Sequence, residues 1–244
     1  MTIANWQLQY PVSAIVFDCD GTLSSIEGIN ELARYNGVGA EITALTEKAM
    51  SETGINPSLY QTRLNLVKPY REQLYQLAQA YYLHCVPDVQ AVIALLTRLG
   101  KSIYIVSAGL NPAVTLFGEL LKISAKHIYA VNLTFDQQGN YVDYERHSPL
   151  TTHLGKRTII NQLKIQHENI IHVGDGLNDY VTQDVVSRFI GYGGIYYREK
   201  LAALCEYYIK TASLASLLPL VLTQNEYEKL TTEEQRLYKK GLQH

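Results

Sequence analysis

The sequence predicts an α/β protein: a doubly wound parallel sheet with a small helical cap inserted after the first strand. The main observation is a set of short β-branched and aromatic runs, each ending in a polar loop with glycine, at residues 12–17, 102–106 and 169–173. The second is a set of helical patterns between or after these runs, at residues 87–99, 111–122, 155–166 and 178–187. Strands that alternate with helices favour parallel pairing, with helices on both faces of the sheet.

Capping residues support the helix boundaries. Residues 87–99 begin with a proline, carry Asp88 in the first turn and end before Gly100, a typical start and stop pattern. Asn111 and Pro112 supply an N-cap and a first turn for the helix after the second strand. Both signals lie where the alternating pattern requires a helix.

Two regions interrupt the alternation of strands and helices. Residues 24–83 have a continuous helical pattern without a convincing strand, which indicates an inserted cap. Residues 130–145 contain two alternating runs around Gln137-Gln138-Gly139-Asn140, which is a hairpin signal. The expected organisation is an α/β core of residues 1–23 and 84–225, a helical cap of residues 24–83 and a C-terminal helical appendage on the surface, residues 226–244.

The composition excludes several classes of protein. Lys and Arg number 21 against 23 Asp and Glu, so the basic surplus of a nucleic-acid-binding protein is absent from the sequence. The apolar run at residues 214–222 is interrupted and falls short of the ~20 residues that cross a bilayer, and residues 1–10 show no secretory signal. The 3 cysteines have no metal-type spacing. We expect a cytoplasmic protein without nucleic-acid or membrane partners, and the sequence allows a homodimer.

Acidic side chains gather in the loops that follow the predicted strands. Four carboxylates and a hydroxyl belong to these loops: Asp18, Asp20, Ser107, Asp175 and Asp179. Ligands of an open α/β sheet bind beyond the carboxyl ends of its strands, so these side chains are expected to converge. Such a cluster repels itself unless a cation is present, and oxygen ligands of this kind suit Mg²⁺. With Lys156 as a fixed positive charge, the sequence predicts a site for a phosphate dianion bridged to a metal.

Spacing excludes other sites that use similar residues. A Ca²⁺ loop starting at Asp18 would need glycine and glutamate where the chain has Leu23 and Ile29. The Gly-Lys pair at the start of the 155–166 helix is no Walker A motif, because Arg157 follows the lysine. A dinucleotide fingerprint fails because Tyr196 stands in place of the third glycine.

Four motifs, in this order, resemble those of the haloacid dehalogenase (HAD) superfamily: Asp18-Cys19-Asp20-Gly21-Thr22-Leu23, Ser107, Lys156 and Gly174-Asp175-Gly176-x-Asn178-Asp179. The resemblance covers roughly residues 12–222. It implies a HAD-like Rossmannoid core and a phosphoric monoester hydrolase. It also implies Mg²⁺ as the cofactor, an aspartyl-phosphate intermediate and a small phosphorylated metabolite as the substrate.

The resemblance assigns the acidic residues to catalysis and metal binding. Asp18 would be the nucleophile, and a carboxylate suits this role because it is ionised at neutral pH. Asp20 would be the general acid that protonates the leaving group and then the base that activates water. Asp18, the backbone carbonyl of Asp20, and Asp175 would hold the metal.

The other motif residues would support the reaction. Ser107 would donate a hydrogen bond to a phosphoryl oxygen, and Lys156 would place its charge where negative charge develops in the transition state. Asp179 would orient Lys156 or a metal-bound water, with Asn178 in support.

Within the predicted cap, Glu27, Met50 and Arg63 have the spacing seen in phosphoserine phosphatases, to which this part of the chain is similar. In that family the glutamate faces the substrate ammonium and the arginine its carboxylate, which are pairings of opposite charge. The resemblance thus implies O-phosphoserine, bound by Glu27, Met50, Arg63, Ser107, Ala108, Gly109 and Asn178. On spacing alone, Glu27 and Arg63 could equally be exposed helix charges, and Met50 could be cap core.

Three positions depart from the phosphoserine phosphatase pattern. Gly21 and Ala108 stand where that family usually has serine and glycine, and Asn56 replaces a phenylalanine that helps to close the site. A polar residue at position 56 would change the shape and wetness of the pocket. Two alternatives therefore stay open: a HAD phosphatase for another small metabolite, such as a phosphoalcohol or a phosphoamine, and a non-catalytic phosphate-binding protein of the same fold.

Overall fold

The computed structural model describes residues 6–48 and 56–243. Its centre is a seven-stranded sheet of order β4-β3-β2-β1-β5-β6-β7. The strands are β1 (Ala14–Phe17), β2 (Ser102–Asn111), β3 (Ile128–Phe135), β4 (Tyr141–Tyr144), β5 (Ile170–Gly174), β6 (Arg188–Tyr192) and β7 (Tyr207–Ile209). Every neighbouring pair is parallel except β3 and β4. The predicted doubly wound parallel sheet is therefore confirmed.

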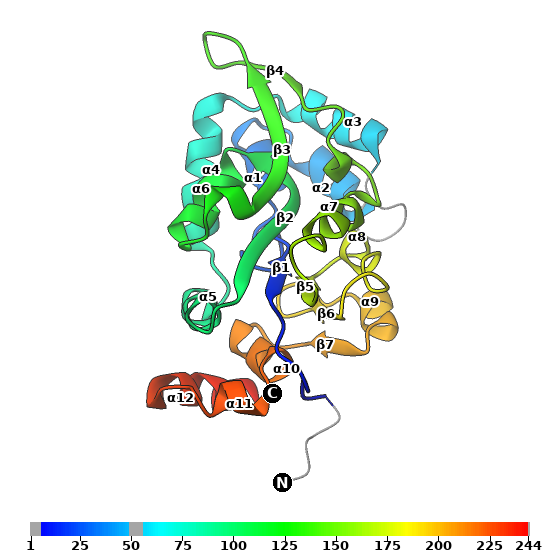
Figure 1. Ribbon diagram of the computed structural model, residues 1–244. Helices are drawn as coiled ribbons and strands as arrows, with labels where there is room; N and C mark the ends of the chain where they lie inside the picture. Colours follow the sequence, from blue (N-terminus) through cyan, green and yellow to red (C-terminus); the bar gives the residue numbers. More distant parts are fainter. Residues whose placement is uncertain (1–5, 49–55, 244) are drawn as a thin grey trace.

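Helices cover both faces of the sheet (Figure 1). One face carries α5 (Val89–Arg98) and α6 (Ala113–Leu120), and the other carries α7 (Gly155–Leu163), α8 (Leu177–Tyr180) and α9 (Glu199–Leu204). All four residues of β1 are buried between these layers, which explains their unbroken apolar run. Among the described helices, none combines the length and apolar character that a bilayer crossing requires.

In the described residues between β1 and β2, the helices that precede α5 are α1 (Gly28–Tyr35), α2 (Gly39–Lys48), α3 (Pro57–Val67) and α4 (Arg71–Leu83). They lie toward the end of the sheet at which β1 finishes, the upper end in Figure 1. This part of the chain is helical as the sequence predicts. These helices therefore lie at the edge of the sheet where the acidic loops emerge.

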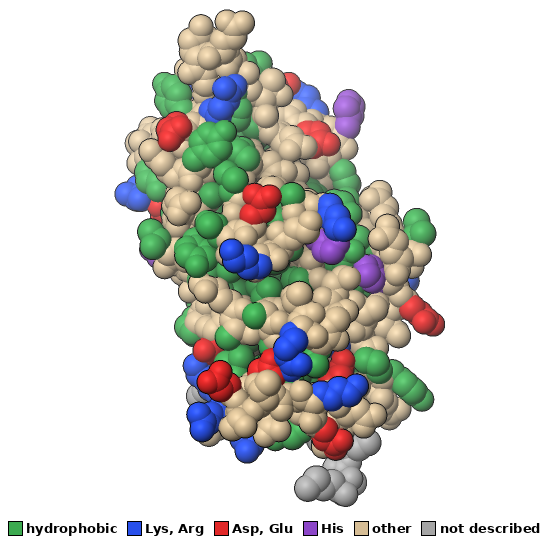
Figure 2. Space-filling model, turned by 60° about the vertical axis from the view of Figure 1, so that its left-hand side comes forward, with side chains coloured by type: hydrophobic (Ala, Val, Ile, Leu, Met, Phe, Trp, Pro, Cys, Tyr) green, Lys and Arg blue, Asp and Glu red, His purple; other side chains and the backbone are tan. Residues whose placement is uncertain are grey.

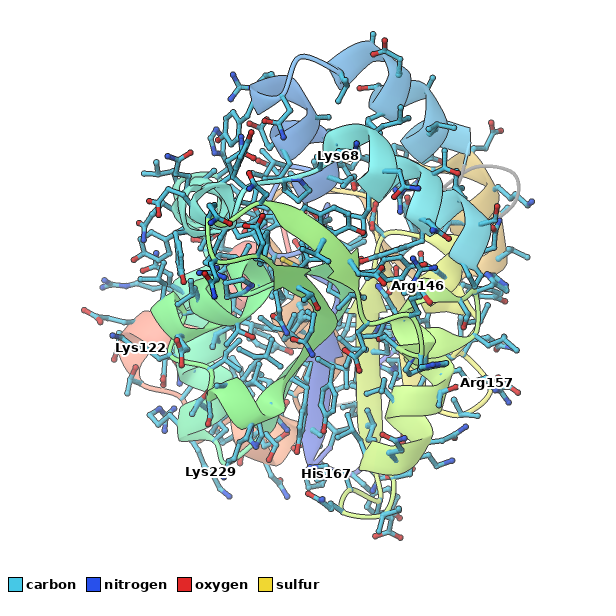
Figure 3. The ribbon with its side chains drawn as sticks, turned by 90° about the horizontal axis from the view of Figure 1, so that it is seen from above. Lys68, Lys122, Arg146, Arg157, His167 and Lys229 are labelled. Atoms are coloured by element: carbon cyan, nitrogen blue, oxygen red, sulfur yellow. The ribbon has the colours of Figure 1, made fainter. Side chains whose placement is uncertain are left out.

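The predicted hairpin is confirmed by the antiparallel pair β3 and β4. Its turn contacts the start of α4, where the backbone N–H of Arg71 donates to the carbonyl of Gly139 at 2.9 Å. Its second strand contacts α3 through the rings of Tyr144 and Tyr60, whose centroids are 5.2 Å apart. Arg146, which follows this strand, lies beside α3 in the view from above (Figure 3). The hairpin thus joins the sheet to the helices over its end.

The C-terminal segment forms α10 (Leu218–Val221), α11 (Gln224–Tyr227) and α12 (Thr232–Gly241) at the opposite end of the molecule (Figure 1). Ion pairs contribute to its attachment: Lys101 Nζ lies 2.7 Å from Glu226 Oε1, and both side chains are almost fully buried. Leu230 and Tyr238 of the same segment are buried in the hydrophobic core. Arg98 pairs with Glu234, and Lys240 pairs with Asp88. Figure 2 shows acidic and basic side chains side by side at this lower end. These pairs hold the C-terminal segment against the rest of the protein.

Several element boundaries differ from the prediction, and two strands are additional to it. Strand β2 continues to Asn111, so the following helix starts only at Ala113. The helix expected over 178–187 ends at Tyr180, because the hydroxyl of Thr182 donates to the carbonyl of Asp179 and competes with the helical bonds. Strands β6 and β7 were not predicted.

Candidate active site

The loops that follow β1 and β5, the far end of β2 and the start of α7 meet below α1, α3 and α4. Among the described residues they enclose a cavity of about 60 Å³, small beside the 300–1,000 Å³ of drug-sized pockets. The predicted site residues that line it are Asp18, Asp20, Glu27, Arg63, Ser107, Ala108, Gly109, Lys156 and Asn178. Asp175 and Asp179 are fully buried next to it. Met50, also predicted to bind substrate, lies outside the described residues.

Lys156 connects two of the motifs. It begins α7 with its ammonium 2.7 Å from Asp18 Oδ1 and 2.6 Å from Asp179 Oδ1. Burial opposes the charge on this ammonium, but the charges of Asp179 and Asp18 outweigh burial and raise the pKa of Lys156. For Asp179 burial is outweighed by Lys156, which lowers the pKa of its carboxyl to about 2. Lys156 and Asp179 therefore form a buried ion pair.

The carboxyls of Asp18 and Asp175 have pKa values above their usual range. Burial raises the pKa of Asp18 well above its usual range, and the charges of Asp179 and Asp175 add to this effect against that of Lys156. Burial likewise raises the pKa of Asp175 to about 6, although Arg198 opposes the rise. Both carboxylates would be stabilised by a further positive charge.

The structure permits a test of whether a divalent cation fits these acids. One carboxylate oxygen from each of Asp18, Asp175 and Asp179 lies within 4.8 Å of the others. Asp175 Oδ1 is buried and has no hydrogen-bond partner in the described part of the chain. A buried acceptor without a partner is costly, so this oxygen is suited to a ligand that the chain itself does not supply. The all-oxygen donor set fits Mg²⁺.

Asp20 is held from two directions. Its Oδ1 accepts a hydrogen bond from the backbone N–H of Gly28 at 2.6 Å and another from the hydroxyl of Tyr81 at 2.8 Å. Burial raises the pKa of the Asp20 carboxyl, and these two donors oppose the rise. A half-buried carboxyl beside the buried Asp18 is in a suitable place for proton transfer.

The end of β2 presents polar atoms to the cavity. The oxygen of Ser107 accepts a hydrogen bond from the N–H of Gly109 at 3.0 Å, so its own hydrogen can be donated elsewhere. The carbonyl of Ala108 accepts from the hydroxyl of Tyr60 at 2.9 Å. A Cβ added to Gly109 would come within 3.2 Å of Asp20 Oδ2, so a side chain there would crowd the acid.

Glu27 and Arg63 both line the cavity and are therefore not ordinary exposed helix charges. Arg63 is 8% exposed, and its guanidinium carbon lies 5.7 Å from the ring centre of Tyr60. Burial lowers the pKa of Arg63, with Tyr60 and Glu27 opposing. Burial and then the charge of Asp20 raise the pKa of Glu27. In addition to the motif residues, the cavity wall therefore carries one basic side chain, Arg63, and one acidic side chain, Glu27.

Two departures from the phosphoserine phosphatase pattern have local explanations. Asn56 is exposed and caps α3 by accepting from the N–H of Leu59 at 3.0 Å, so it serves the helix rather than the cavity. Gly21 has a φ of 68°, and a Cβ there would lie 2.7 Å from Asp175 Oδ2. Glycine is thus required by both the backbone and the close carboxylate.

Three residues at the site had not been predicted: Tyr60, Tyr81 and Arg198. Arg198 donates from Nη2 to Asp175 Oδ2 at 2.8 Å and from Nε to the carbonyl of Asp175 at 2.9 Å. The two tyrosines bind Ala108 and Asp20, as described above. None of the three lies in a motif with a recognisable spacing, and the sequence contains no signal that would have found them.

Comparisons with known proteins agree with this geometry. A family model described as haloacid dehalogenase-like hydrolase matches residues 12–182. The human phosphoserine phosphatase is 29% identical over 205 residues, which are 83% of this chain and 91% of the human protein. The Drosophila melanogaster phosphoserine phosphatase is 28% identical over 80% of this chain and 73% of its own.

Solved structures show the same fold. A phosphoserine phosphohydrolase-like protein from Francisella tularensis has a TM-score of 0.75 at 24% identity, over 84% of this chain and 99% of its own. A phosphoserine phosphatase solved as an analogue of its phospho-aspartyl intermediate has a TM-score of 0.76 at 24% identity, over 87% of this chain and 100% of its own. The expected class, a phosphoric monoester hydrolase resembling phosphoserine phosphatases, is confirmed, and the chain belongs to the haloacid dehalogenase-like hydrolase family.

Proposed function

We propose that the protein is a Mg²⁺-dependent phosphomonoesterase that hydrolyses O-phospho-L-serine through an aspartyl-phosphate on Asp18. The observation that carries this proposal is the contact of one lysine, Lys156, with both Asp18 and Asp179 at the wall of a small cavity that also contains Asp20. Nucleophile, fixed cation and general acid are then all within reach of one bound phosphate.

Asp18 would form the new bond. Its carboxylate oxygen attacks phosphorus while the bond from phosphorus to the ester oxygen breaks. Asp20 gives its proton to that ester oxygen, so the alcohol leaves neutral and the phosphoryl group remains on Asp18. Asp20 then accepts a proton from the water that attacks the phosphoryl group, which releases inorganic phosphate and restores both carboxyls. Lys156 and Ser107 stabilise the negative charge of the phosphoryl oxygens.

Asp18, the backbone carbonyl of Asp20, and Asp175 would hold Mg²⁺, which when bound supplies positive charge that offsets the repulsion between carboxylate and phosphate. Asp179 keeps Lys156 in place through the 2.6 Å contact. Arg198 fixes the orientation of Asp175. Lys156 and Asp175 would thus supply charges at the phosphate and the metal, and Asp179 and Arg198 would keep these two side chains in position.

Phosphoserine is favoured as substrate by the two cap residues. Arg63 would pair with the substrate carboxylate as a two-pronged donor, and Glu27 with its ammonium. A cavity of about 60 Å³ suits a small substrate. The human relative, at 29% identity, is a phosphoserine phosphatase. We also propose that residues 24–83 form a cap domain on a core of residues 1–23 and 84–225.

A second candidate is a phosphatase for another small phosphomonoester, such as a phosphoalcohol or phosphoamine. It is favoured by Tyr60, whose hydroxyl binds the Ala108 carbonyl and whose ring lies at the cavity wall beside Arg63. A ring at this place occupies room that a substrate could otherwise use.

Phosphate release from a panel of substrates tests both candidates. The panel contains O-phospho-L-serine, phosphoethanolamine, glycerol phosphate and p-nitrophenyl phosphate, each with Mg²⁺ and with EDTA. We expect the highest kcat/KM for O-phospho-L-serine and no turnover with EDTA. A preference for phosphoethanolamine would favour the second candidate. A protein that binds phosphate but hydrolyses no member of the panel would be a non-catalytic binding protein.

A further inference from the structure

Tyr81 contacts the proposed general acid although it comes from a distant part of the chain. It lies on α4 and is 0% exposed, and the centroids of its ring and of the Phe117 ring are 5.4 Å apart. Its hydroxyl donates to Asp20 Oδ1 at 2.8 Å. A phenol is protonated at neutral pH, so this hydroxyl remains a donor. The hydrogen bond between Tyr81 and Asp20 therefore lies in the buried interior of the site.

The two oxygens of Asp20 have different surroundings. Oδ1 accepts from both Tyr81 and the backbone N–H of Gly28. Oδ2 faces the end of β2: a Cβ placed on Gly109 would lie 3.2 Å from this oxygen and 3.1 Å from the oxygen of Ser107. One oxygen is thus occupied by two donors, and the other faces the side of the cavity where Ser107 would bind a phosphoryl group.

The backbone is shaped to allow this contact. Gly28 begins α1, and a Cβ on it would lie only 2.0 Å from the hydroxyl oxygen of Tyr81. Any side chain at position 28 would therefore push the hydroxyl away from Asp20. The glycine makes room for the tyrosine and at the same time offers its own N–H to the same carboxylate oxygen.

We propose that Tyr81 is a positioning residue for Asp20: its hydroxyl fixes Oδ1, so that Oδ2 is the oxygen that delivers the proton to the leaving group. This inference rests on the proposed phosphatase function. During the first step the proton moves from Asp20 Oδ2 to the ester oxygen as the phosphorus–oxygen bond breaks and the bond to Asp18 forms. Tyr81 exchanges no proton in this step and acts through Asp20.

The leaving group makes this role measurable. An alkoxide leaves poorly without a proton, so its ester depends on a correctly oriented Asp20, whereas p-nitrophenolate leaves without help. Tyr81→Phe removes only the hydroxyl. We expect it to lower kcat/KM at least about 10-fold for the best alkyl phosphate of the panel and less than about 3-fold for p-nitrophenyl phosphate. We expect the loss in kcat, with KM changed less than about 2-fold.

Tyr192→Phe is the matched control. Tyr192 is another tyrosine with 0% exposure whose hydroxyl donates to a backbone carbonyl, that of Ala212, and it does not line the cavity. We expect this variant to keep the wild-type ratio of the two kcat/KM values. Because both substrates are measured on one preparation, an incompletely folded sample lowers both values and leaves their ratio unchanged.

Gly28→Ala provides a second route to the same defect, since its methyl group would displace the hydroxyl while keeping the tyrosine. The same shift in substrate ratio is expected from it. Equal losses on both substrates in Tyr81→Phe, or no loss at all, would overturn the positioning role while leaving the phosphatase function intact. A wild-type protein without activity on any substrate would instead end the proposed function, and this inference with it.

Discussion

Arg198 holds Asp175 at two points, with Nη2 2.8 Å from Oδ2 and Nε 2.9 Å from the backbone carbonyl. This clamp leaves Oδ1 of the aspartate as a buried oxygen that no described residue binds. A proposed metal ligand is thus oriented by an arginine that follows the sheet's sixth strand. Such outer partners tune metal affinity as well as geometry.

Arg198→Met should therefore weaken metal binding more than it affects the reaction. We expect the Mg²⁺ concentration for half-maximal activity to rise about 10- to 100-fold, with kcat largely recovered at saturating Mg²⁺. Titration of activity with Mg²⁺ measures this. Arg146→Met, at an exposed arginine paired with Asp143, is the control and should leave the Mg²⁺ requirement unchanged. An unchanged requirement in Arg198→Met would contradict the role of the clamp.

Asp18→Asn should abolish turnover without unfolding the protein. The amide removes the nucleophile, but Lys156 keeps its 2.6 Å contact with Asp179, so the buried ammonium is not left without a charged partner. We expect activity to fall about 1,000-fold or more, while the thermal midpoint changes by less than about 5 °C. Asp184→Asn, at an exposed aspartate paired with Arg157, should retain full activity. Substantial activity in Asp18→Asn would rule out the aspartyl-phosphate.

The stability of the metal-free protein should depend on pH through Asp175. Its pKa rises from 3.8 to about 6, so between about pH 4 and pH 6 the folded state binds more protons than the unfolded state. The free energy of unfolding then falls as pH rises through this window, by roughly 3 kcal/mol for this group. Mg²⁺ should offset this loss, so it should stabilise more at about pH 7.5 than at about pH 5.

Thermal melts at the two pH values, with and without Mg²⁺, check this prediction. In Asp175→Asn the group no longer titrates, so both the pH slope in this window and the pH dependence of the Mg²⁺ effect should shrink. An equal Mg²⁺ stabilisation at both pH values in the unmodified protein would argue against a metal bound at this carboxylate.

Arg63→Met should discriminate between substrates with and without a carboxylate. If the guanidinium binds the carboxylate of phosphoserine, KM for that substrate should rise at least about 10-fold, because a charge-assisted pair is lost. KM for phosphoethanolamine, which has no carboxylate, should change less than about 2-fold. Steady-state kinetics on the two substrates measure this, and equal changes would show that Arg63 has no carboxylate-specific role.

Glu226→Gln should destabilise the protein without affecting catalysis. It leaves the ammonium of Lys101, whose side chain is 1% exposed, without its charged partner. Breaking a buried ion pair from one side costs about 3 kcal/mol. We expect a loss of this size in urea unfolding, with kcat and KM unchanged. Glu228→Gln, at an exposed glutamate bonded to Gln224, should cost less than about 0.5 kcal/mol.

The sequence predicted the parts of the fold that have strong local signals. The run before Asp18 is apolar on both faces and the run before Asp175 is apolar except for His172, and they form β1 and β5 next to each other. The hairpin around Gly139 has a turn signal and is present. Strand β7, by contrast, has only the three residues Tyr207–Ile209, which is too short for a periodic pattern.

The site was predictable where its residues belong to motifs. The spacing around Asp18, Lys156 and Asp175 identified the acids and the lysine because these positions follow strands or begin a helix. Tyr81 and Arg198 act through side chains that reach across the fold, and the sequence gives no distance between segments that are far apart in the chain. The burial of Glu226 was missed for a related reason, since a glutamate in a polar segment has no local sign of a buried partner.

The position of α11 and α12 has a practical consequence. They lie at the end of the molecule opposite the helices that cover the cavity (Figure 1). A fluorophore or an affinity handle joined to the chain after α12 would therefore be attached far from the cavity. Immobilised or labelled protein prepared in this way should keep the kinetics of the free enzyme.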